Sequence, residues 1–134
     1  MSESNELYQR GAAKMREVYA GDVVELPEGT MAFSDVMMRS LFAQVWTRDE
    51  QLDRRSRRLL LMGVIAAQGQ SDTWKIQARA ALRHRELTAD ELRETLVQLA
   101  PYAGYPNVAP LVMACEEVIG AWSAEGEPGY ESDG

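Results

Sequence analysis

Three uncharged polar side chains occur at helical spacing in the sequence GQSDTWKIQARAA. In a helix, Gln70, Thr73 and Gln77 stand at positions i, i+3 and i+7 and therefore share one face. Trp74 lies on the same face, so we expect this face to be buried. Amide and hydroxyl groups donate and accept hydrogen bonds but do not titrate near neutral pH. The pattern has two interpretations: the side chains satisfy one another within a core, or they line a pocket and bind a ligand.

The elements that position this face are predicted to be helices. Apolar residues recur at the helical period in six segments, and no convincing strand occurs. The predicted helices cover roughly residues 5–19, 32–47, 55–68, a fourth from Ser71 or Asp72, a fifth from Thr88, and 107–122. We predict an all-α protein with a single domain, residues 1–123, and an acidic disordered tail, residues 124–134.

Two of these helices have distinctive local patterns. The third, residues 55–68, is apolar all round, so we expect it to be covered both by the fold and by a neighbouring subunit. Thr88 and Glu91 have the spacing of a capping box at the start of the fifth helix. Pro101 ends or kinks that helix, and Gly104 lets the chain turn.

Composition and charge exclude several classes of function. Cys115 is the only cysteine and His84 the only histidine, which excludes a disulfide within the chain, a multi-cysteine metal site and a histidine-rich zinc centre. The net charge of -7 disfavours nucleic-acid binding, which needs a basic surface. We expect no metal, no other cofactor and no nucleic-acid partner.

The sequence also predicts no membrane partner. The N-terminal sequence MSESNELYQR lacks the pattern of a signal peptide, and the longest apolar run, Leu59 to Ala67, is too short to cross a bilayer. We expect a cytoplasmic protein.

Three stretches, taken in order, resemble the carboxymuconolactone decarboxylase family. They are VWTRDEQLDRRSRRLLLMGVIAAQG, WKIQARAAL and LTADELRETLVQLAPYAGYPNVAP, and the resemblance covers about Phe33 to Trp122. The residues that match the family pattern are Trp46, Thr47, Arg48, Leu52, Arg57, Arg79, Ala80, Ala81, Thr88, Glu91, Tyr102, Gly104 and Pro106. The resemblance implies an alkylhydroperoxidase-D-like helical domain that forms a homotrimer or homohexamer, with sites near subunit contacts.

The resemblance also shows where this sequence departs from the wider superfamily. Alkylhydroperoxidase-D-like proteins carry a glutamate followed by Cys-x-x-Cys-x-x-x-His, and these positions correspond to Arg58, Gln70, Thr73 and Gln77 here. Thiolate chemistry on a peroxide or disulfide is therefore excluded. The polar face of the fourth helix lies where the superfamily has its reactive groups.

The decarboxylase branch usually keeps the histidine, and Gln77 replaces it here. An amide does not shuttle protons near pH 7, but it donates a hydrogen bond to a developing enolate. We therefore expect Gln77, Tyr102 and Tyr105 to be catalytic, with a tyrosine protonating carbon, in an enzyme acting on a small anionic lactone. The alternative is a non-catalytic binding or assembly protein that keeps the fold.

The remaining candidates also have two interpretations each. Trp46 forms a pocket rim or belongs to the core, and Arg57 holds a substrate carboxylate or braces the fold. Gln70 and Thr73 bind substrate if the fourth helix lines a pocket. The basic run that includes Arg54 and Arg58 is expected to be mainly a solvated face with salt bridges.

Overall fold

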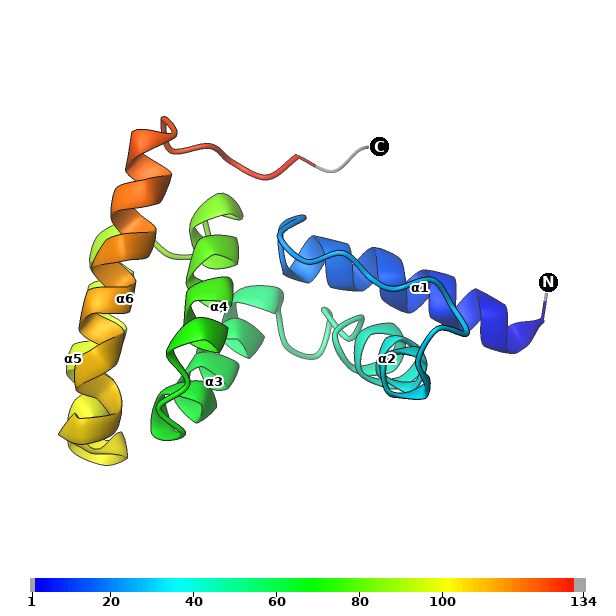
Figure 1. Ribbon diagram of the computed structural model, residues 1–134, viewed down its shortest axis with the longest axis horizontal. Helices are drawn as coiled ribbons and strands as arrows, with labels where there is room; N and C mark the ends of the chain where they lie inside the picture. The colour runs from blue at the N-terminus through cyan, green and yellow to red at the C-terminus, as the bar shows by residue number, and fades with distance from the viewer. Residues whose placement is uncertain (1, 132–134) are drawn as a thin grey trace. The chain divides into compact units, whose positions relative to one another are not determined.

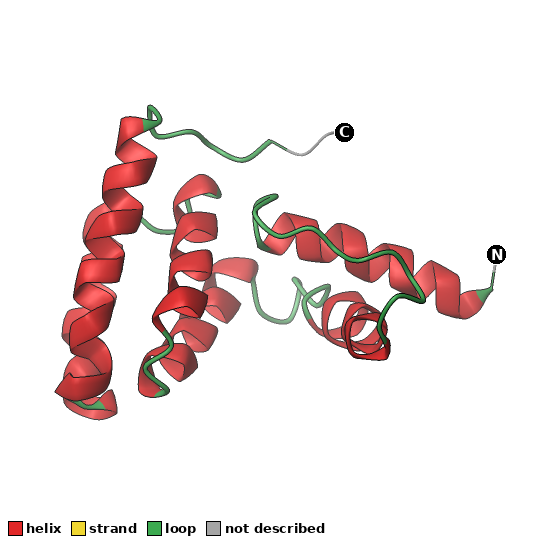
Figure 2. Cartoon of the chain, in the orientation of Figure 1, coloured by secondary structure: helices red, strands yellow, loops and turns green. Residues whose placement is uncertain are grey.

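The computed structural model describes residues 2–131, and within them every regular element is a helix (Figures 1 and 2). The helices are α1 (Glu3–Val18), α2 (Ala32–Met37), η1 (Met38–Val45), α3 (Arg54–Ala67), α4 (Ser71–Arg83), α5 (Ala89–Ala103) and α6 (Tyr105–Ala124). The prediction of an all-α protein is confirmed. The predicted second helix corresponds to α2 and η1 together, because a π-helical stretch continues α2 directly: the Trp46 N–H donates to the Leu41 carbonyl.

The chain divides into two compact units, one up to Arg54 and one from Arg55 onward. In the first unit α1 packs against η1, and α2 leads into η1. The two helices α1 and η1 approach each other closely at Gly11, where an added Cβ would clash with the Met38 carbonyl oxygen. Tyr19 and Phe42 also pack edge to face, with ring centroids 5.8 Å apart. Close backbone packing and aromatic contact therefore hold the first unit together.

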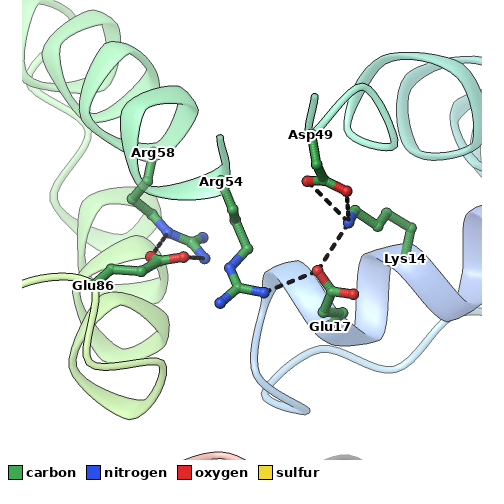
Figure 3. Close-up of polar contacts among 6 residues, drawn as sticks. All are labelled: Lys14, Glu17, Asp49, Arg54, Arg58 and Glu86. Atoms are coloured by element: carbon green, nitrogen blue, oxygen red, sulfur yellow. Dashed lines mark hydrogen bonds and ion pairs between the residues drawn. The ribbon is translucent and has the colours of Figure 1, made fainter. Parts of the chain in front are cut away.

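A buried lysine links α1 to the loop after η1 (Figure 3). The Lys14 ammonium lies 2.9 Å from a Glu17 carboxylate oxygen and 3.0 Å from Asp49, and Arg54 donates to the same Glu17 oxygen at 2.9 Å. Burial acts to raise the pKa of Glu17, but the hydrogen bonds from Lys14 and Arg54 outweigh it and hold the pKa below its ordinary value.

In the second unit α4 and α5 both pack against α6 (Figure 1). Trp74, Leu92 and Leu111, one from each of these helices, are fully buried in the shared core. The predicted capping box at the start of α5 is present: the Thr88 hydroxyl accepts from the Glu91 N–H, and the Glu91 carboxylate accepts from the Thr88 N–H. The start of α5 is therefore set by its own sequence.

The turn between α5 and α6 occurs where the sequence predicts it. Helix α5 continues through Pro101 to Ala103, and Gly104 then adopts a positive φ of 97°. This conformation, which favours glycine, lets α6 begin at Tyr105.

The predicted all-round burial of α3 holds for only part of the helix. Met62, Ile65 and Ala66 are buried, whereas the Leu60 side chain is 65% exposed and Val64 55% exposed. The uncovered apolar side of α3 is the part that we expected a neighbouring subunit to cover.

The segment after α6 contacts the end of α4. The Trp122 indole N–H donates to the Pro128 carbonyl at 2.9 Å, and the Tyr130 N–H donates to the Arg83 carbonyl at 2.8 Å. The Tyr130 ring packs edge to face against His84. Residues 125–131 belong to the segment that we predicted to be a disordered tail; residues 132–134 of that segment lie outside the described residues. No helix in the described part of the chain is both long and apolar enough to cross a membrane.

Candidate functional site

A buried network of three polar side chains joins α3 and α4 with the turn that follows α4. The Arg58 Nη1 donates to the Gln77 Oε1 at 2.8 Å, and the Arg58 Nε donates to the Glu86 Oε1 at 2.8 Å. The Arg58 Nη2 lies 3.5 Å from the second Glu86 oxygen, so guanidinium and carboxylate meet side by side (Figure 3). Arg58 is 0% exposed, Gln77 2% and Glu86 9%. The network therefore includes a desolvated ion pair and an amide held by its cationic member.

Local structure places the members of this network. Arg58 precedes Met62 by four residues and Ile65 by seven, so it belongs to the buried stripe of α3. The chain leaves α4 through Arg85 in a left-handed conformation with φ of 55°, and the Glu86 N–H then donates to the Ala81 carbonyl. This turn directs Glu86 back toward α3.

A second arginine holds the Glu86 backbone. The Arg55 Nε donates to the Glu86 carbonyl oxygen at 2.8 Å, and the Arg55 Nη2 lies 3.1 Å from a Glu91 carboxylate oxygen. Side chain and backbone of Glu86 are thus bound by different arginines of α3.

The expectation of a solvated basic run is wrong for Arg58. Its side chain is fully buried, because it faces the core side of α3 and has a carboxylate partner 28 residues away. The position of Arg58 on the stripe of Met62 and Ile65 was visible in the sequence, but the partner was not.

The predicted polar face of α4 is only partly buried. Gln77 is buried together with Trp74 and Ala78, as expected, but Gln70 and Thr73 are exposed. Gln70 is the residue before α4, and Thr73 lies in its first turn, so the burial that begins at Trp74 does not extend to them. The expectation that all three lie in a buried face is therefore wrong for the chain by itself.

The structure does not bring the two predicted tyrosines together with Gln77. Tyr102 is 84% exposed near the end of α5, and Tyr105 is 67% exposed at the start of α6. The cavities recorded among residues 2–131 include one lined by Tyr105 and none lined by Gln77. Arg57 is half-buried on α3 of the same unit, whereas Trp46 is buried in the first unit.

An apolar cavity of about 430 Å³, which the sequence did not reveal, lies between α5 and α6. An ion pair between Arg93 and Glu116, joined by two 2.9 Å hydrogen bonds, forms part of its wall. Its lining also includes Leu96, Val97, Ala100, Tyr105, Val108, Ala109, Val112 and Cys115. Apart from Tyr105, the lining contains none of the predicted site residues.

The thiol in that wall is not an activated nucleophile. Burial, and to a lesser extent the neighbouring Glu116 carboxylate, raises the pKa of Cys115 to about 11. A thiol with this pKa is protonated at neutral pH and reacts slowly. Within residues 2–131, no group of three or more histidine, cysteine, aspartate or glutamate side chains has an arrangement that could hold a metal ion.

The helical fold and the family motifs define the class of protein to which this chain belongs. Residues 32–117 match the carboxymuconolactone decarboxylase family model, and the chain belongs to that family. The matched region contains Arg58, Gln77 and Glu86, so the whole buried network lies within the family domain.

One curated relative gives the family a particular example. The chain is 31% identical over 87 residues to a 4-carboxymuconolactone decarboxylase from Acinetobacter baylyi (strain ATCC 33305 / BD413 / ADP1). The matched region covers 65% of this chain and 63% of the relative, so it spans less than two thirds of the relative's length. No solved structure matches the chain significantly.

Proposed function

We propose that the protein is a carboxymuconolactone-decarboxylase-like enzyme that acts without a redox cofactor on a small anionic lactone. Family membership and the name of the Acinetobacter relative support the reaction class. The observation that carries the proposal is the Gln77 amide, which is buried in the family domain with its oxygen bound to Arg58. Its nitrogen, which carries two hydrogens, has no recorded acceptor among residues 2–131.

The chemistry requires a hydrogen-bond donor at such a position. When a carboxylate leaves as carbon dioxide from a carbon conjugated with a lactone carbonyl, the electron pair moves onto the carbonyl oxygen. A donor preorganised in a site of low polarity stabilises that oxygen more than water does. In this proposal the Gln77 amide nitrogen supplies the hydrogen bond, and a tyrosine returns a proton to carbon.

The tyrosine would come from another copy of the chain. Tyr102 and Tyr105 are exposed, and an uncovered apolar side of α3 lies in the same unit. A homotrimer or homohexamer would cover these surfaces and would place exposed residues such as Gln70, Thr73 and Tyr102 beside a neighbour. Arg57 would then bind the substrate carboxylate as a planar cation. We propose this assembly in the cytoplasm as part of the function.

A second candidate is a non-catalytic binding or assembly protein that keeps the family fold. The observation that favours it is that the Gln77 side chain is only 2% exposed and lines none of four well-defined cavities among residues 2–131. An amide enclosed by its own chain would serve stability alone.

Carbon dioxide release from 4-carboxymuconolactone distinguishes the two candidates. We expect turnover by the wild type and a loss of at least about tenfold in kcat for Gln77→Ala, which corresponds to one lost transition-state hydrogen bond. Tyr102→Phe tests the proton donor, and Gln51→Ala in the exposed loop after η1 is the control. Release by neither wild type nor any variant would favour the non-catalytic candidate. Full turnover by Gln77→Ala would show that the site assignment is wrong.

A further inference from the structure

Arg58 controls which way the Gln77 amide points. A guanidinium has N–H donors and no acceptor, so the group that faces Arg58 Nη1 at 2.8 Å must be the amide oxygen. The reverse orientation would set two donors against each other within a buried site. Gln77 therefore presents its nitrogen, with two hydrogens, on the side away from Arg58.

Glu86 keeps Arg58 in that position. Its carboxylate accepts from Arg58 Nε at 2.8 Å and lies 3.5 Å from Nη2, which leaves Nη1 directed at Gln77. Arg55 holds the Glu86 carbonyl at 2.8 Å, and the turn after α4 holds its N–H. The orientation of one amide thus depends on an ordered set of contacts from two helices and a turn.

The amide nitrogen remains available to a ligand. Among the described residues, two side-chain polar atoms are fully buried and make no hydrogen bond: Glu25 Oε2 and Trp74 Nε1. The Gln77 nitrogen also lacks an acceptor but is not one of these fully buried atoms. It therefore keeps a small accessible surface, although the Gln77 residue is only 2% exposed. Buried donors normally have an acceptor, and a ligand oxygen would supply it here.

We propose that Arg58 is a positioning residue that makes Gln77 a permanent hydrogen-bond donor, so that the site selects a ligand acceptor such as a lactone carbonyl or carboxylate oxygen. This inference rests on the proposed function for the location of the ligand. It adds the specificity: a ligand group that has donors and no acceptor, such as an ammonium group, would meet the hydrogens of Gln77 and be rejected.

The first test changes the donor and keeps the shape. Gln77→Glu still accepts from Arg58 but presents an oxygen in place of the amide nitrogen. The probe is 5-oxotetrahydrofuran-3-carboxylate, a saturated lactone acid, and its Kd is measured by calorimetry. We expect Kd to rise at least about tenfold for Gln77→Glu, as for loss of a hydrogen bond to a charged or strongly polar group. Gln51→Glu makes the same change on an exposed loop and should leave Kd unchanged.

The second test leaves Gln77 unchanged and reverses the charges around it. In the double variant Arg58→Glu/Glu86→Arg the ion pair is kept, but a carboxylate now faces the amide and draws its hydrogens inward. We expect the probe to bind at least about tenfold more weakly, while the melting temperature shows that the fold is retained. A purely structural role for the pair predicts normal binding in this variant. If the double variant does not fold, the Kd of the probe for Gln77→Glu is by itself the test of the inference.

The outcomes separate this inference from the proposed function. Probe binding that Gln77→Glu weakens, without carbon dioxide release by the wild type, supports the inference and contradicts the proposed reaction. Carbon dioxide release with probe binding that is the same in wild type and Gln77→Glu overturns the inference and leaves the reaction intact. Failure of the wild type to bind the probe at about 10 mM, the weak limit of a specific small-ligand complex, also overturns it.

Discussion

Replacing Glu86 with leucine removes the carboxylate that pairs with Arg58 and leaves the cation in its buried position. The two side chains are 0% and 5% exposed and meet at 2.8 Å, so neither regains water without local unfolding. Removing one member of a buried pair costs about 3–5 kcal/mol, because the remaining charge stays desolvated. For a chain of 134 residues this lowers Tm by roughly 10–20 °C.

A double-mutant cycle shows whether the penalty comes from the stranded charge. Arg58→Met/Glu86→Leu removes both charges, and the Gln77 oxygen loses its Arg58 donor at a cost of about 1–3 kcal/mol, so the double variant should be more stable than Glu86→Leu. Urea denaturation followed by circular dichroism measures the free energies of unfolding. Glu116→Leu is the control, because Glu116 pairs with Arg93 at similar distances but both side chains are about half-exposed, and the Tm of this variant should hardly change. A loss of less than about 1 kcal/mol in Glu86→Leu, or a double variant less stable than the single, would refute the assignment of a desolvated ion pair.

Three further predictions concern the thiol, a helix crossing and a helix cap. Because its pKa is raised to about 11, the Cys115 thiol should react slowly with a disulfide reagent at pH 8, faster as the pH approaches 11, and at the rate of an ordinary thiol after unfolding in urea. Gly11→Ala should destabilise the protein by at least about 1–3 kcal/mol, whereas Gly120→Ala, which meets nothing within 4 Å, should stabilise it by roughly 0.5–1 kcal/mol; opposite signs in urea melts are the check. Thr88→Ala should cost about 1 kcal/mol through loss of the cap on α5, and an unchanged urea midpoint would contradict this.

Local patterns in the sequence predict the helices well. The capping box of Thr88 and Glu91, the turn at Gly104 and the buried stripe of α4 from Trp74 to Ala81 all depend on residues within a few positions of one another. The family prediction is confirmed, because residues 32–117 match the family model. Patterns between residues a few positions apart can be recognised in one sequence without any knowledge of tertiary packing.

The candidate site depends on contacts that no local pattern contains. Arg58 is of the same type as the less buried arginines beside it, and its burial requires Glu86, which lies 28 residues away and is directed by a left-handed turn at Arg85. Similarly, the helical period places Thr73 on the core face of α4, but the extent of covering at the helix end is decided by neighbouring elements. The helical period predicts toward which face of a helix a side chain points, whereas its burial depends on which other element covers that face.

The residue at position 58 determines what a residue at position 77 does. If Gln77 alone were changed to histidine, one ring nitrogen would have to accept the hydrogen bond from Arg58, and the adjacent positive charge would lower the pKa of the imidazole. That histidine would remain neutral and would donate from its other nitrogen, the role proposed for the amide, without becoming a proton shuttle. Changing Arg58 to a carboxylate as well would set two carboxylates against each other, so this second change would require a third one at Glu86. Under the proposed function, the network therefore favours hydrogen-bond donation at position 77, and Gln77→His alone does not introduce a proton shuttle.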